Sequence, residues 1–61
     1  MTSLPLHVIP TRLGVWRVVR EGDDRALSEH GNVTEAVGRA HVSGSHEVVV
    51  HDRYGRLHVE R

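Results

Sequence analysis

Six histidines are the residues best able to do chemistry in this 61-residue chain, and they stand at positions 7, 30, 41, 46, 51 and 58. An imidazole titrates near neutral pH and is a common ligand of transition metals. His41, His46 and His51 are five residues apart, and a hairpin predicted in the last third of the chain would place His58 across from the strand that bears His51. However, His46 and His51 would point to opposite faces of one strand, and no HxH or HExxH spacing occurs. We therefore predict scattered surface histidines, with no metal site and no cofactor.

Carboxylates and hydroxyls are the other candidate catalytic groups. Asp23 and Asp24 are adjacent in an acidic, glycine-containing run that is typical of a turn. A solvated turn lacks the burial that general acid–base catalysis exploits. Ser28, Ser43 and Ser45 lack a nucleophile elbow, and no glycine-rich loop of a phosphate-binding type is present. We predict that the protein is not an enzyme and has no small-molecule substrate.

Four arginines and one tyrosine suggest an alternative function, which is nucleic-acid binding. If the strand that bears the only Trp neighbours the last hairpin, one end of the sheet would gather Arg17, Arg20, Arg53, Tyr54 and Arg56. Guanidinium groups beside an aromatic ring suit single-stranded nucleic acid. Against this, the formal net charge is zero, whereas nucleic-acid-binding domains usually carry a basic excess. Weak nucleic-acid binding is therefore the second hypothesis, and protein interaction is the first.

One helix and five strands must position these groups. Short runs rich in β-branched and aromatic residues, separated by turn residues, predict the strands. Asn32 is a good N-cap, Glu35 follows it at the spacing of a capping box, and Ser43-Gly44-Ser45 ends the helix after about ten residues. The predicted strands cover residues 6–10, 15–20, 25–29, 47–51 and 56–60, and the helix begins at Val33.

The order strand, strand, strand, helix, strand, strand predicts an α+β fold in one small domain of residues 1–61, with residues 1–5 frayed. The sheet is expected to be mostly antiparallel, with the short helix packed on one face. Side-chain alternation and the apolar stripe of the helix select the residues expected to form the core. These residues are Trp16, Val18, Ala36, Val37, Ala40, Val48, Val50, Leu57 and Val59.

The expected core is thin. The chain has no Cys and no Phe, and its apolar set is dominated by Val, so neither disulfides nor large side chains compensate for the small size. One helix covers only one face of the sheet, and Val15, Val19 and Val49 are candidates for the other. We therefore expect a homodimer, or a complex with another protein, to bury that face.

The N-terminal residues lack the basic and apolar regions of a secretory signal, and the longest apolar run, Val48–Val50, is too short to cross a bilayer. The sequence therefore predicts a cytoplasmic protein that does not bind membranes.

Several short motifs follow one another along the chain. Val8–Pro10 is followed by Gly14–Val18, Arg20–Gly22, a capped helix with Glu35-Ala36, and finally Val49–Leu57. Their order and spacing, over nearly the whole chain, resemble the small prokaryotic family known as domain of unknown function 2188. The resemblance implies a Trp-containing strand before an Arg-Glu-Gly turn, an alanine-striped helix and a closing hairpin. It implies no activity, so no functional residue is carried over from it.

Overall fold

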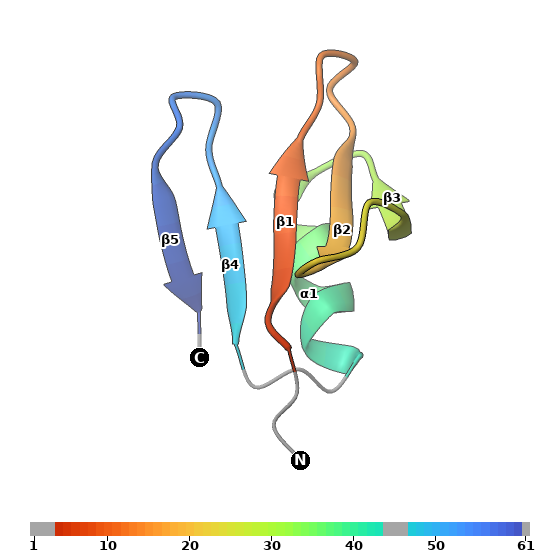
Figure 1. The fold of residues 1–61 in the computed structure, drawn as a ribbon. Coiled ribbons are helices and arrows are strands. Elements are labelled where there is room, and N and C mark those ends of the chain that lie inside the picture. Colours follow the sequence, from red (N-terminus) through yellow and green to blue (C-terminus); the bar gives the residue numbers. More distant parts are fainter. Residues whose placement is uncertain (1–3, 44–46, 61) are drawn as a thin grey trace.

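The computed structural model describes residues 4–43 and 47–60 and shows an α+β fold, in which one helix packs on a five-stranded sheet (Figure 1). Every predicted element is present, and its bounds differ from the prediction by at most one residue. The elements are β1 (Leu6–Pro10), β2 (Trp16–Arg20), β3 (Ala26–His30), α1 (Val33–Val42), β4 (Val48–His51) and β5 (Leu57–Glu60).

The strands are arranged in the order β3-β2-β1-β4-β5, which makes β1 the central strand. Neighbouring strands are antiparallel except β1 and β4, which are parallel. A parallel pair needs a crossover connection, and α1 provides it between β3 and β4. Pro10 is tolerated in this central strand because it is the last residue of β1, where the ladder ends. The strand that bears Trp16 therefore does not neighbour the last hairpin, because β1 lies between them.

The helix begins and ends at the predicted residues. The side-chain oxygen of Asn32 accepts a hydrogen bond from the backbone N–H of Glu35 at 2.9 Å, which satisfies one of the free donors of the first turn. At the other end, the N–H of Ser43 donates to the carbonyls of Arg39 and Ala40. Ala36 and Ala40 are completely buried, so their small side chains let α1 lie close to the sheet.

The core lies between α1 and the face of the sheet that α1 covers, mainly on strands β1, β2 and β4. It consists of Leu6, Val8, Val18, Ala36, Ala40 and Val48, against which Trp16, Val33, Val37 and Val50 pack while partly exposed. Seven of the nine predicted core residues are thus in or against the core. Trp16 is a half-buried anchor at the margin of the core, and Leu6 and Val8 on the central strand belong to the core although they are not among the residues predicted to form it.

Leu57 and Val59 correct the prediction, because they are 62% and 45% exposed and face away from the helix. The register pairs Val50 with His58 and Val49 with Val59. Since Val50 packs against the helix, its partner His58 shares that face, and Val59 takes the opposite one. Alternation defined the two faces of β5 correctly, but it does not say which face meets the helix. In addition, α1 contacts β1 to β4 and does not reach β5.

Of the five N-terminal residues expected to fray, residues 1–3 lie outside the described residues. The carbonyl of Pro5 accepts a hydrogen bond from the N–H of Glu21 at 3.0 Å, so the chain is held at this point. In the ranges 4–43 and 47–60, no helix is long and apolar enough to cross a membrane.

Candidate interaction face

The face of the sheet opposite α1, here called the open face, is not covered by any helix of residues 4–43 and 47–60. One row of side chains crosses four strands of this face in register, from Val59 on β5 through Val49 and His7 to Val19 on β2. Val19 and Val49 were predicted to lie on this face, and they do, but they are only 9% and 7% exposed because neighbours in the row flank them. The row is therefore apolar on both sides of a single histidine.

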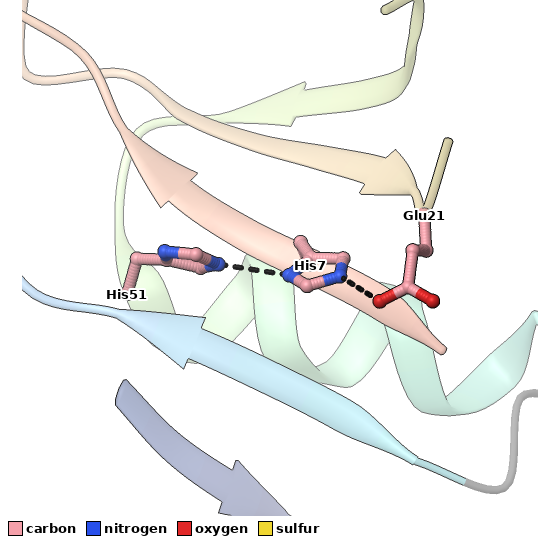
Figure 2. Close-up of polar contacts among 3 residues, drawn as sticks. All are labelled: His7, Glu21 and His51. Carbon is pink, nitrogen blue, oxygen red and sulfur yellow. Dashed lines mark hydrogen bonds and ion pairs between the residues drawn. The ribbon is translucent and has the colours of Figure 1, made fainter. Parts of the chain in front are cut away.

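His7 joins two other polar side chains on the open face. Its Nδ1 lies 2.8 Å from Nε2 of His51, and its Nε2 lies 3.2 Å from Oε1 of Glu21 (Figure 2). The two rings come from the neighbouring strands β1 and β4, with centroids 5.1 Å apart and planes tilted by 47°. A chain of hydrogen bonds thus runs from the carboxylate through His7 to His51.

The carboxylate determines where the protons of this chain lie. A carboxylate oxygen only accepts, so Nε2 of His7 donates to Glu21. In neutral His7 the other nitrogen, Nδ1, then carries a lone pair and accepts from Nε2–H of His51. Burial lowers the pKa of His51 below its ordinary value of 6.5, and the proximity of His7 lowers it further. The neutral form of His51 is therefore favoured more strongly in the folded protein than in the unfolded chain.

The pKa of His51 predicts how stability depends on pH in the metal-free protein. In the unfolded chain His51 takes up a proton near pH 6.5, whereas the folded protein takes it up only at lower pH. The folded state therefore binds fewer protons between these two values. The contribution of His51 is fully present above pH 6.5 and is lost as the pH falls through the folded-state pKa.

Urea denaturation with a chelator present, between about pH 7.5 and about pH 5.5, measures this effect. The unfolding free energy is expected to fall toward the acidic end, and less steeply in His51→Gln than in the unchanged protein. An equal slope in both proteins would contradict the assignment to His51. Three charged residues, Arg12, Asp52 and Arg53, line a hollow together with His51. They are present in both proteins, so they do not account for a difference between the two slopes.

The remaining histidines do not form the cross-strand pair that the sequence suggested. His51 pairs in register with Leu57, while His58 pairs with Val50 and faces the helix side, so His51 and His58 lie on opposite faces. His58 contacts Glu60 instead, at 3.4 Å. His46 lies outside the described residues. The prediction missed the contact between His7 and His51 because 44 residues separate them, and nothing in the sequence indicates that their strands are parallel neighbours.

The five arginine and tyrosine positions are not gathered into one patch. Arg53, Tyr54 and Arg56 lie in or beside the β4–β5 turn, where Asp52 accepts hydrogen bonds from the N–H groups of Tyr54 and Arg56. Arg17 lies on the open face, with its Nε 3.4 Å from Oε2 of Glu29. Arg20 is the last residue of β2 and lies at the other end of the sheet (Figure 1). The predicted patch required β2 to neighbour β4, which it does not.

Arg12, which is not among the predicted arginines, lies near the β4–β5 turn. The β1–β2 turn lies at the same end of the sheet (Figure 1), and Arg12 from that turn and Arg53 line one open hollow of about 470 Å³ together with His51 and Asp52. The prediction omitted Arg12, and the parallel pairing of β1 with β4 is what places the two turns together.

The acidic turn and the serines have local structural contacts. Asp23 accepts a hydrogen bond from the N–H of Arg25 at 3.1 Å, as turn-forming aspartates do. Ser28 Oγ lies 2.9 Å from Nε2 of His30, two residues along the same strand. Ser43 donates its hydroxyl to the carbonyl of Arg39 at the end of the helix. Ser45 lies outside the described residues.

Comparison with known proteins identifies the chain at the level of family. No curated protein and no solved structure matches it. Residues 6–61 match a family described as an uncharacterized protein conserved in bacteria (DUF2188). This range begins at β1 and includes every strand and the helix, as the order of motifs in the sequence had indicated. The chain belongs to the bacterial family DUF2188.

Proposed function

We propose that this chain is a small, non-enzymatic protein-interaction module that associates with a second copy of itself through the open face of its sheet. The observation that supports this most directly is the row Val59, Val49, His7 and Val19, which is apolar on both sides of the histidine and is not covered by a helix in the described part of the chain. We place the module in the cytoplasm, a reducing compartment that suits a chain without Cys.

Exposed apolar side chains extend the row toward both edges of the sheet. Val59 and Leu57 on β5 are 45% and 62% exposed, and Leu27 on β3 is 44% exposed. Leu27 shares the face of Glu29, which contacts Arg17 on the open face. Exposed apolar side chains on a face of the sheet that no helix covers are candidates for a site of association, although Val49 and Val19 between them add little exposed surface. One pair of opposite charges on this face is already matched, since Arg17 lies beside Glu29.

The open face is small, which suits a weak and reversible dimer. Strands of four or five residues, spaced about 4.8 Å apart with a rise of about 3.3 Å per residue, give a face of about 24 × 16 Å, or about 400 Å² in projection, which is below the 800 Å² or so that each partner buries in a standard interface. A twofold arrangement would place the same row on both copies against each other, which is the self-complementary contact that such dimers need.

Sedimentation velocity over a range of protein concentrations tests the proposal. The particle is expected to shift from the monomer mass of 6.8 kDa to twice that value as the concentration rises. Val59→Asp would place a charge in the apolar row, and we expect it to weaken association by at least about tenfold, since an unpaired buried charge costs more than about 1.4 kcal/mol.

His58→Asp is the matched control, because it adds the same carboxylate on the same strand, one residue away, but facing the helix side. It is expected to leave the dimer intact. A mass of 6.8 kDa at every concentration, or equal weakening by both substitutions, would overturn the proposal.

A weak nucleic-acid-binding role is the second candidate, and the two turns at one end of the sheet favour it. Arg12 and Arg53 line one hollow there, and the ring of Tyr54 is 88% exposed beside Arg53. Fluorescence anisotropy with a labelled single-stranded oligonucleotide separates the two functions. Binding at low salt that is lost in a double Arg12→Ala and Arg53→Ala variant would favour this role, and absence of binding at low salt would exclude it.

A further inference from the structure

The nitrogens of His7 and His51 that face each other are the strongest chemical feature of the open face. They are 2.8 Å apart and come from two parallel strands, so both rings are held by the sheet and not by a loop. Two imidazole nitrogens this close together belong to the donor set that zinc and other late transition metals bind, once both nitrogens carry a lone pair.

Glu21 gives His7 the orientation of a metal ligand. A metal-bound histidine usually donates its other ring N–H to a carboxylate, which fixes the ring and its tautomer. His7 makes this contact, with its Nε2 at 3.2 Å from Oε1 of Glu21, so that Nδ1 presents its lone pair toward His51. His51 presents a second lone pair once its proton is on Nδ1, the ring nitrogen that does not face His7 in Figure 2.

One chain supplies only part of a coordination shell. Within residues 4–43 and 47–60, no group of three or more His, Cys, Asp or Glu side chains could hold a metal, and zinc takes four ligands in a structural site. The two histidines lie among the apolar residues of the open face. A twofold axis passing through this point would bring two more imidazoles from a second copy.

We propose that His7 and His51 of two copies together bind one zinc ion. This inference rests on the proposed self-association and identifies the ligand that stabilises it. Four neutral imidazoles would complete a closed tetrahedral shell, and the two Glu21 carboxylates behind them would balance the charge of the ion.

The geometry requires both rings to move. Zinc–nitrogen bonds of about 2.0–2.1 Å at a tetrahedral angle separate two ligand nitrogens by about 3.3 Å. The nitrogens of His7 and His51 are 2.8 Å apart and face each other along a hydrogen bond, so they would move apart by about 0.5 Å, and each ring would turn by about 35° so that both lone pairs point at the ion. Any proton shared between them must leave the facing nitrogens, so binding is expected to weaken as the pH falls.

Zinc sulfate, titrated into chelator-treated protein, tests the inference in two measurements. Isothermal titration calorimetry is expected to give one zinc per two chains, and sedimentation velocity is expected to show that zinc raises the dimer fraction and that EDTA reverses the increase. His51→Gln and His7→Gln are each expected to abolish zinc uptake. Glu21→Gln is expected to weaken zinc binding by about 10–100-fold while the ligands remain.

His58→Gln is the control, because this histidine is well exposed on the other face and should bind no zinc at the shared site. Zinc uptake that survives in both His7→Gln and His51→Gln would overturn the inference, as would one zinc per chain without a change in mass. A zinc-free dimer that zinc leaves unchanged would overturn it too, while leaving the proposed self-association in place. Circular dichroism is used to confirm that each variant is folded before its zinc binding is measured.

Discussion

Replacing Leu6 with Ala is expected to lower the free energy of unfolding by about 2–5 kcal/mol. Leu6 is only 2% exposed and is among the largest completely buried side chains of the described residues. It lies on the central strand, paired with Arg20 of β2 and Val48 of β4, and its side chain is in the core between the sheet and α1, so the space left by the lost atoms would open there. Most of the other fully buried side chains are Val and Ala, which are too small to fill it.

The effect is large because the total stability is small. A domain of this size has an unfolding free energy of about 3–9 kcal/mol, so one core truncation removes a large part of it. Urea denaturation followed by circular dichroism at low protein concentration measures the change. Leu13→Ala is the matched control: Leu13 is 89% exposed in the β1–β2 turn, and its truncation should change stability by less than about 0.5 kcal/mol. Equal effects of the two truncations would contradict the core described above.

Local signals in the sequence predicted each element, because the forces that define them are local. Asn32 caps the helix through a hydrogen bond to a residue three positions away, and Gly55 has the positive φ of 82° that a tight turn requires. Side-chain alternation likewise assigned alternate residues of β5 to opposite faces. Which face meets the helix depends on register with β4 and on the reach of α1, and neither is a local property. For that reason Leu57 and Val59 were wrongly placed in the core.

The candidate site was harder to predict because it depends on which strands are neighbours. His7 and His51 meet because β1 occupies the centre of the sheet and pairs in parallel with β4. The same strand order separates Arg17 on β2 from Arg53 in the β4–β5 turn. The prediction that they form one patch assumed that β2 is next to the last hairpin. Spacing along the chain relates His51 to His46 and His58, which are near it in sequence, and gives no relation to His7.

The melting temperature is expected to rise with protein concentration, which is the largest effect that the proposed self-association predicts. A ligand at about a hundred times its Kd stabilises the native state by about 2.7 kcal/mol, and a second copy acts in the same way. For a domain of 60–100 residues, each kcal/mol moves the melting temperature by about 4–8 °C. Dilution from saturating concentration to well below the Kd should therefore lower it by on the order of 10–20 °C.

Val59→Asp separates this effect from other consequences of dilution. The melting temperature of the variant should begin to rise only at concentrations at least about tenfold higher than in the unchanged protein, and at high dilution the two should melt close to the same temperature, because Val59 is partly exposed in the monomer and its loss removes little of the core. His58→Asp should retain the concentration dependence, because His58 faces the other side of the sheet. Both series need the same chelator, so that metal bound at His7 and His51 does not contribute. A melting temperature that does not change with the concentration of the unchanged protein would mean that the thin core is sufficient by itself, and that the open face has another use.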